Sequence, residues 1–147
     1  MLLVTVDTKI KIIYNKAILE KATYVGGKML CTLNLDAVNS FLNTCRKEIK
    51  KGNHYFVGYR KININGKKIS AKQALIDIGI MKEKDIWKHI QSLEVNECVK
   101  IDRDYDRSRD MNSEIYVFKK IINTKMIYIK LTINNRGIVC ISFHESC

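Results

Sequence analysis

The stretch Glu114–His144, EIYVFKKIINTKMIYIKLTINNRGIVCISFH, decides how this chain folds. It holds three runs rich in Ile, Val, Tyr and Phe, at 114–122, 125–134 and 138–144, which short segments containing Asn or Gly separate. Runs of β-branched and aromatic residues bounded in this way are typical of strands joined by tight turns. The sequence therefore predicts an antiparallel β meander in the last third of the chain.

Polar and apolar side chains alternate in the middle run of this meander. The apolar face holds Ile127, Ile129, Leu131 and Ile133, and the polar face holds Tyr128, Lys130 and Thr132. Since successive side chains of a strand point to opposite faces of a sheet, one face is expected to be core. In the last run, the same pattern assigns Ile141 and Phe143 to the core and Ser142 and His144 to the polar face.

The loop between the last two runs sets their register. A three-residue loop with Gly137 in the left-handed conformation pairs Asn134 with Ile138. The same register places Tyr128 opposite His144. A two-residue loop would shift each pair and turn His144 toward the core, so the binary pattern favours the three-residue loop. With an Asn123-Thr124 turn before the middle run, this register gathers on one face Lys119, Tyr128, Lys130, Ser142 and His144.

The residues before the meander predict helices. Apolar residues at helical spacing, followed by Gly52, indicate a helix over 34–51; they are Val38, Phe41, Leu42, Cys45 and Ile49. A capping box at Ser70–Gln73 opens a second helix, which Gly79 ends, and a third helix is expected over 82–92. Helices followed by a meander define an α+β fold, in which the helices pack on the antiparallel sheet.

The remaining segments complete the predicted organisation. We expect a strand over 54–59, an Asn65-Gly66 turn, and a charged connection with scattered apolar positions over 94–112. Residues 1–35 begin with runs of Val, Ile and Thr. They are expected to form a β-rich N-terminal extension that packs on the same domain as 36–147.

The composition predicts one basic domain. The chain has 147 residues, with 26 Lys and Arg against 15 Asp and Glu, a formal charge of +11. Its five cysteines form no CxxC pair and its three histidines show no ligand spacing, so no disulfide framework, metal site or cofactor is indicated. No apolar run reaches the roughly 20 residues that cross a bilayer, and no signal peptide is recognised. We therefore expect a soluble, cytoplasmic protein.

Positive charge is concentrated in one segment. Residues 46–72 hold nine Lys and Arg against one acid, and the rings of His54, Tyr55, Phe56 and Tyr59 interleave with them. Aromatic side chains can stack on unpaired bases while neighbouring Lys and Arg side chains contact the phosphates, so single-stranded RNA is the leading partner. Arg60, Lys61 and Tyr59 are the candidate RNA-binding residues of this segment. An acidic protein partner is the alternative.

The polar face of the meander holds what RNA cleavage without a metal requires. Such cleavage needs a base for the ribose 2′-OH, an acid for the 5′-oxygen and cations for the phosphate. His144 can act as acid or base near neutrality, Lys130 can contact the phosphate, and Tyr128 can orient the histidine. A solvated sheet face with an incidental histidine is the alternative interpretation.

The closing sequence resembles a known family. The runs MIYIKL at 126–131 and VCISFH at 139–144, with EIYVF at 114–118 before them, are similar to the C-terminal meander of MqsR-type toxins of toxin–antitoxin systems. The helices upstream resemble the same family, so that the likeness covers roughly 38–144. Residues 1–35 have no recognised counterpart.

The resemblance implies a RelE-like fold, metal-independent and sequence-selective cleavage of mRNA, and neutralisation by a cognate antitoxin. Tyr128 and Lys130 match the family's Tyr-x-Lys strand, and His144 follows its Ser-Phe pair. Lys100 matches a lysine after the third helix, and Ser113 lies near a polar residue that precedes the Val-Tyr strand. The predicted catalytic residues are His144, Lys100, Tyr128 and Lys130, and the predicted RNA-binding residues are Arg60, Lys61, Lys119, Tyr59 and Ser113.

Two functions of different classes follow from these patterns. The first is a toxin-type endoribonuclease, an mRNA interferase that cuts RNA through attack of the 2′-OH. The second is a protein of the same fold that does not cleave RNA. It would be a basic binding or inhibitor protein of a phage-type mobile element that engages a nucleoprotein or nucleic acid. A DNA-binding regulator is a third option, which no helix-turn-helix pattern supports.

Overall fold

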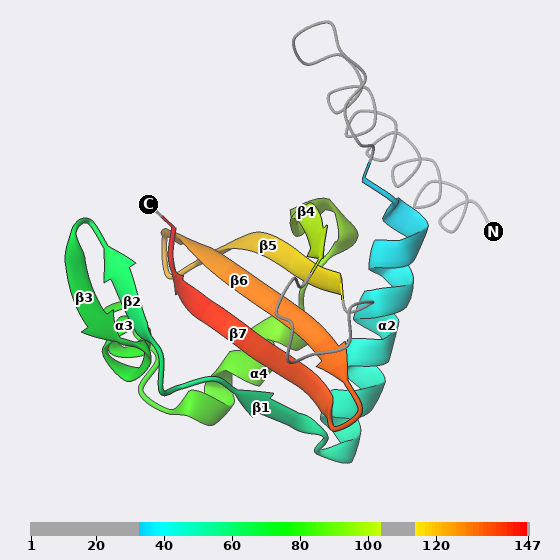
Figure 1. The fold of residues 1–147 in the computed structure, drawn as a ribbon, viewed down its shortest axis with the longest axis horizontal. Coiled ribbons are helices and arrows are strands. Elements are labelled where there is room, and N and C mark those ends of the chain that lie inside the picture. Colours follow the sequence, from blue (N-terminus) through cyan, green and yellow to red (C-terminus); the bar gives the residue numbers. More distant parts are fainter. Residues whose placement is uncertain (1–32, 104–113, 147) are drawn as a thin grey trace, which may run out of the picture.

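The computed structural model describes residues 33–103 and 114–146, which form an α+β fold (Figure 1). Three α-helices and a mixed five-stranded sheet make up most of this part of the chain, and a two-stranded hairpin stands at one side. The predicted α+β class is thus confirmed. The predicted β-rich extension falls on residues 1–32, outside the described residues, apart from its last positions, which lead into the first described helix.

The helices and strands have the following bounds. The helices are α2 (Leu35–Lys51), α3 (Ala71–Asp77) and α4 (Ile86–Gln91), with 3₁₀ turns at Glu83–Asp85 and Val95–Glu97. The strands are β1 (His54–Phe56), β2 (Lys61–Ile64), β3 (Lys67–Ser70), β4 (Cys98–Arg103), β5 (Glu114–Ile122), β6 (Lys125–Asn134) and β7 (Gly137–Glu145).

Both ends of α2 and its buried face agree with the sequence prediction. The side chain of Asn34 accepts a hydrogen bond from the backbone N–H of Ala37 in the first turn. Gly52 ends the helix with φ +83°, a conformation that glycine adopts without a Cβ clash. The buried residues are Leu35 and the predicted stripe of Val38, Phe41, Leu42, Cys45 and Ile49.

The other two helices are short. The hydroxyl of Ser70 caps α3 by accepting from the backbone N–H of Gln73, as predicted. The Nε2 group of Gln73 donates to Asp77, and the reciprocal bond from the Ser70 backbone N–H to the Gln73 side chain, which would complete the predicted capping box, is not formed. The helix predicted over 82–92 is a 3₁₀ turn followed by the shorter helix α4.

The five-stranded sheet has the strand order β1-β7-β6-β5-β4. The last four strands are antiparallel neighbours, whereas β1 pairs with β7 in parallel. The predicted antiparallel meander is therefore the centre of a mixed sheet. The strand predicted over 54–59 ends at Phe56, because the chain turns at Gly58 and Tyr59.

Strand β4 corrects the prediction of a charged connection over 94–112. It forms the sheet edge beside β5. Two features hide this strand in the sequence. A register shift between Cys98 and Lys100 interrupts the alternation of side chains, and charged residues follow it, which is common on an edge strand.

The pairing of β5 with β6 is as predicted, with Lys119 opposite Tyr128. The predicted loop between β6 and β7 is wrong. Asn134 pairs with Gly137 and not with Ile138, so the loop has two residues and not three.

A β-bulge in β7 compensates for the shorter loop. Lys130 pairs with Ser142 and Leu131 pairs with Cys140, so Ile141 is an extra residue in β7 without an opposite partner. The pairs beyond the bulge are the predicted ones. The predicted polar face is therefore preserved although the predicted loop is not.

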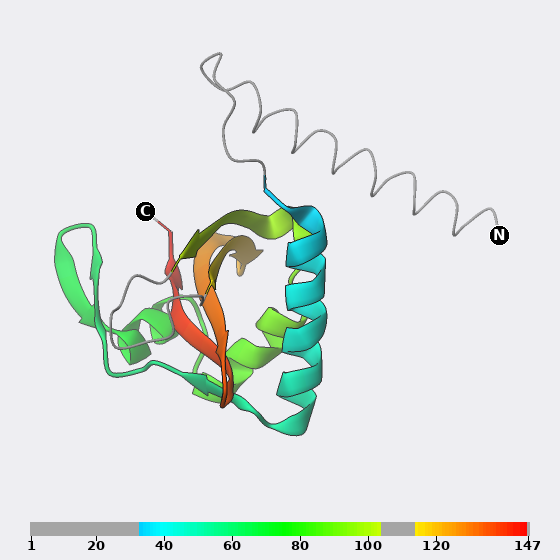
Figure 2. The same cartoon turned by 45° about the vertical axis from the view of Figure 1, so that its right-hand side comes forward.

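Helices cover one face of the sheet, as the position of α2 and α4 in Figure 2 shows. This face holds the main core, whose largest fully buried side chains include Phe118, Phe143 and Leu42. A smaller apolar cluster consists of Val57, Ile115, Val117, Val139 and Ile141, with Tyr128 packed against it. The prediction that Ile141 joins Phe143 in the main core is wrong, because the bulge shifts Ile141 to the opposite face.

Candidate functional site

The sheet face opposite the helices holds two rows of side chains that run across the strands. In the first row, Lys100 pairs with Val117, Val117 with Lys130, and Lys130 with Ser142. Paired residues on neighbouring strands point to the same face, with Cβ atoms about 4.5–5.5 Å apart. Four strands thus bring two of the predicted catalytic lysines to one face.

The second row consists of Lys119, Tyr128 and His144 on β5, β6 and β7. The rings of Tyr128 and His144 stack, with centroids 5.3 Å apart and planes inclined by 25°. Since this row is two residues along each strand from the first, Lys130 is a diagonal neighbour of His144 at about 7–8 Å. Lys119 is exposed, whereas the two rings are half-buried.

A hydrogen bond selects the tautomer of the neutral His144 ring. Its Nδ1 lies 2.9 Å from the backbone carbonyl oxygen of Glu145. Because a carbonyl oxygen only accepts, this contact places a proton on Nδ1 and leaves Nε2 as the acceptor of the neutral ring. Nε2 is thus the atom of this row that can take a proton from a substrate hydroxyl.

Lys100 is held by an ion pair in this structure. Its ammonium lies 3.1 Å from the carboxylate of Asp102, and both side chains are about half exposed, at 55% and 43%. The hydrogen bond and the negative charge of Asp102 raise the pKa of Lys100, and Tyr128 adds to this effect. An exposed pair is screened by water, so a phosphate can replace the carboxylate at small cost.

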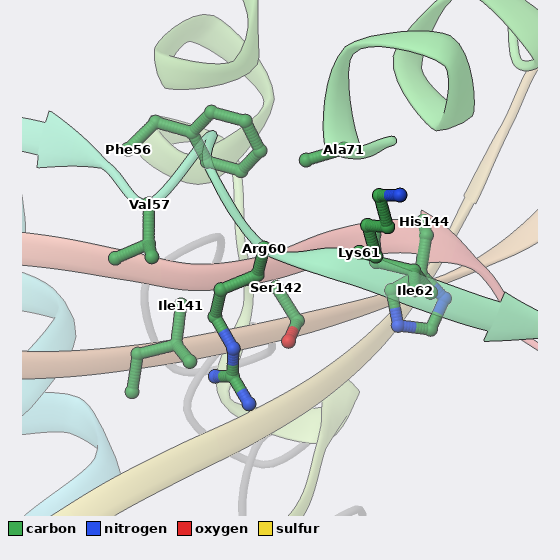
Figure 3. Close-up of a pocket in the computed structure, with 9 residues that line it drawn as sticks. All are labelled: Phe56, Val57, Arg60, Lys61, Ile62, Ala71, Ile141, Ser142 and His144. Atoms are coloured by element: carbon green, nitrogen blue, oxygen red, sulfur yellow. The ribbon is translucent and has the colours of Figure 1, made fainter. Parts of the chain in front are cut away.

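A pocket of about 130 Å³ opens beside these rows at the edge of β7 (Figure 3). Its polar lining comes from Arg60, Lys61, Ser142 and His144, and its apolar lining comes from Phe56, Val57, Ile62, Ala71 and Ile141. Figure 3 shows the Arg60 guanidinium and the His144 ring on the two sides of Ser142, with the Lys61 ammonium pointing away from them. Two predicted RNA-binding residues therefore lie in the same hollow as the predicted catalytic histidine.

One predicted site residue lies away from the pocket, and the position of another is not described. Tyr59 is 84% exposed and does not line the pocket. Ser113 lies outside the described residues. Conversely, sequence analysis did not identify Asp102 as a partner of Lys100, nor the apolar side of the pocket. One sequence feature indicates the bulge beside the pocket. The run from Ile138 to Ile141 is apolar at every position, so it breaks the alternation of a regular strand, and the bulge at Ile141 accounts for the extra apolar residue.

The other two histidines lie on the helical side of the sheet. The His54 ring packs on Trp87 with centroids 4.4 Å apart, and the His89 ring lies 6.3 Å from that of Phe143. Burial lowers the pKa of His89, and the nearby charge of Lys120 lowers it further. Because Phe143 belongs to the main core, the sheet separates His89 from His144.

Within residues 33–103 and 114–146, no group of three or more His, Cys, Asp or Glu side chains is arranged to hold a metal ion. Among the helices of this part of the chain, none is both long enough and apolar enough to cross a membrane.

Comparison of the chain with protein-family models and with curated proteins finds no match. The site is therefore interpreted from its own geometry.

Proposed function

We propose that this protein is a metal-independent endoribonuclease of the mRNA-interferase type, with a RelE-like fold related to that of MqsR toxins. Its substrate is single-stranded mRNA, and a cognate antitoxin neutralises it in the cytoplasm. One observation carries the proposal: Lys100, Lys130 and His144 share one sheet face, next to a pocket that Arg60 borders.

His144 is the base in this reaction. Its Nε2 takes the proton of a ribose 2′-OH, and the 2′-oxygen attacks the adjacent phosphorus atom. The bond from phosphorus to the 5′-oxygen breaks, and the 5′-oxygen leaves as a hydroxyl. The His144 imidazolium formed in this way returns one proton to the 5′-oxygen, so the step consumes no water and restores the neutral ring. The products are a 2′,3′-cyclic phosphate and a 5′-hydroxyl end.

The lysines of the first row stabilise the negative charge that builds up on the phosphate. Lys130 is a diagonal neighbour of His144, and Lys100 exchanges the Asp102 carboxylate for a phosphate oxygen. Tyr128 positions the imidazole through the ring stack. Arg60 and Lys61 bind the adjoining part of the RNA strand.

Incubation of the purified protein with a long unstructured RNA in EDTA tests the proposal. We expect discrete cuts that end in 2′,3′-cyclic phosphate and that disappear in His144→Ala. His89→Ala is the matched control, because it removes a histidine from the other side of the sheet, and it should cut normally. Lys100→Ala is expected to slow cleavage at least tenfold, as loss of a transition-state charge contact does. Full cleavage by both His144→Ala and Lys100→Ala would contradict the proposal.

A binding protein without catalysis is the second candidate. The Lys100–Asp102 pair favours it, because a carboxylate at this position opposes an anionic substrate. If the RNA stays intact in a preparation without bound antitoxin, and an acidic protein or a nucleoprotein is captured in stoichiometric amount, this second function is supported.

A further inference from the structure

We infer that the pocket beside His144 is a base-recognition subsite that takes one unstacked nucleobase of the RNA strand and prefers guanine. The position of this base next to the cleaved bond rests on the proposed function, whereas the binding itself does not require cleavage.

The pocket arises from the bulge in β7. Strand β1 follows β7 only as far as Cys140, where the backbone N–H of Val57 donates to the Cys140 carbonyl at 2.9 Å. Ile141, the extra residue, comes next. Bulges end strand pairing and redirect side chains, and both effects occur here. The chain leaves the sheet edge at Gly58, and the hollow lies between this departing segment and the second half of β7.

The apolar part of the lining suits a flat heterocycle better than a bare phosphate. Phe56, Ile62 and Ile141 supply aromatic and aliphatic surface from three different strands or their ends. The faces of a base gain from contact with such surface, as they do in single-strand-binding proteins. A phosphate ion gains nothing from apolar walls, because it must keep its hydrogen bonds to water or to donors.

The arginine of the pocket matches one base edge. Arg60 presents hydrogen-bond donors only, the Ser142 hydroxyl can both donate and accept, and among the described residues that line the pocket none is acidic. Figure 3 shows the Arg60 guanidinium beside Ile141 and Ser142, at the side of the hollow. An arginine fork forms two hydrogen bonds with the O6 and N7 acceptors of guanine, which is the base edge that matches it best.

The position of the pocket determines which base is recognised. His144 lines the pocket and also stands in the second row, diagonal to Lys130. A base held in the pocket therefore has its sugar and phosphate next to the His144 ring. It belongs to a nucleotide that flanks the cleaved bond, so the pocket is expected to contribute one position of the cleavage consensus.

Binding of the four nucleoside 3′-monophosphates to the full chain, followed by NMR chemical shifts, tests the inference without cleavage. We expect 3′-GMP to bind several times more tightly than 3′-AMP, 3′-CMP or 3′-UMP, with shifts in residues 56–62 and 141–144. Arg60→Ala should lower the 3′-GMP affinity about tenfold and remove the preference. Arg136→Ala is the matched control, since Arg136 is an exposed arginine in the turn at the other end of β7.

Equal binding of the four nucleotides overturns the inference, and so do identical chemical-shift changes with inorganic phosphate alone.

Mapping of cut sites separates failure of the base-recognition subsite from failure of the proposed function. If the wild type cuts RNA and Arg60→Ala cuts with the same base preference, the subsite is wrong and the nuclease stands. If RNA stays intact while 3′-GMP binds with a preference that depends on Arg60, the nuclease is wrong and the subsite stands.

Discussion

Tyr128 and His144 lie directly opposite each other on β6 and β7, and their rings stack with centroids 5.3 Å apart. The Nδ1 atom of the same imidazole contacts the backbone carbonyl oxygen of Glu145 at 2.9 Å. The ring is therefore restrained through one face and through one edge. The Nδ1 contact leaves Nε2 as the accepting atom, and the stack holds the plane of the ring, so Tyr128 is a positioning residue for His144.

Replacement of Tyr128 with Leu is expected to slow single-turnover RNA cleavage by about two- to tenfold, because a stacked aromatic pair contributes about 0.5–1.5 kcal/mol. Tyr128→Phe keeps the stacked ring and should restore nearly the wild-type rate. The ring ¹⁵N shifts of His144 give a second measurement, since loss of the stack should mix its two tautomers. A Tyr128→Leu variant with an unchanged rate and unchanged shifts would show that the stack has no positioning role.

Replacement of Asp102 with Asn is expected to tighten RNA binding about threefold, the size typical of an exposed ion pair. Asp102 raises the pKa of Lys100, so the variant lowers that pKa toward its ordinary value of 10.5, and Lys100 stays protonated at neutral pH. The gain comes from removal of the competing carboxylate. Fluorescence anisotropy with a 2′-O-methyl oligonucleotide, which cannot be cut through a 2′-OH, measures it.

The control for this variant is Asp36→Asn, which makes the same charge change in the exposed first turn of α2. This helix covers the other face of the sheet (Figure 2), so the local effect of Asp102 should be absent. Equal tightening by both variants would assign the effect to net charge alone and not to the Lys100 pair.

The polar rows could be predicted from the sequence because alternation along β6 is regular. Ile127 and Ile129 are fully buried, whereas Tyr128 and Lys130, which alternate with them, are half-buried. The two-residue period of a strand is therefore enough to assign each side chain to the core face or the polar face. The loop before β7 could not be predicted in this way. A two-residue loop with a bulge at Ile141 gives the same pairs at the site as a three-residue loop without one.

The pocket and the edge strand depend on contacts between distant segments. Phe56 and Ile62 reach the pocket only because β1 pairs in parallel with β7 and then leaves it, and parallel pairing has no local sequence signal. Lys100 was placed by resemblance and not by strand pattern, since the shift after Cys98 hides the alternation of β4. Tertiary pairing therefore supplies the part of the site that periodicity does not.

Acidification is expected to destabilise the protein partly through His89. Burial lowers the pKa of His89 below its ordinary value of 6.5, and Lys120 lowers it further against the opposing effect of Asp85. The unfolded chain then binds a proton more readily than the folded one. The stability that neutral His89 provides is present above pH 6.5 and is lost as the pH falls through the lowered pKa.

Urea unfolding at about pH 7.5 and about pH 5 measures this contribution. His89→Gln, which cannot take up a proton, should show a smaller loss of midpoint on acidification than the wild type. An equal loss in the two proteins would assign the acid sensitivity to other groups.

Three cysteines of the described residues are expected to resist alkylation in the native state. Cys45, Cys98 and Cys140 are buried, and burial raises the pKa of Cys45 and of Cys98 to about 12 and raises that of Cys140 as well. The reactive thiolate is therefore scarce at mildly alkaline pH. Iodoacetamide treatment followed by peptide mass spectrometry should find these sites unmodified, and modified in guanidinium chloride. Native labelling at Cys98 would mean that the edge strand β4 opens.

Gly137 is expected to be the glycine least tolerant of alanine among those at turns of positive φ in the described residues. It has φ +123°, and a Cβ there would overlap the backbone carbonyl of Asn53, whose oxygen accepts from the Ile138 N–H at 3.0 Å. Gly137→Ala should therefore cost about 2–4 kcal/mol of the free energy of unfolding.

Gly66→Ala is the matched control. Its φ is +81° and no atom lies within 4 Å of the added Cβ, so the cost is about 1 kcal/mol. Urea denaturation followed by circular dichroism compares them, and equal costs would contradict the close approach of the Asn53 backbone to β7. Since that approach joins β1 to β7 and β1 carries Phe56 to the pocket, Gly137→Ala should also weaken 3′-GMP binding, whereas Gly66→Ala should not.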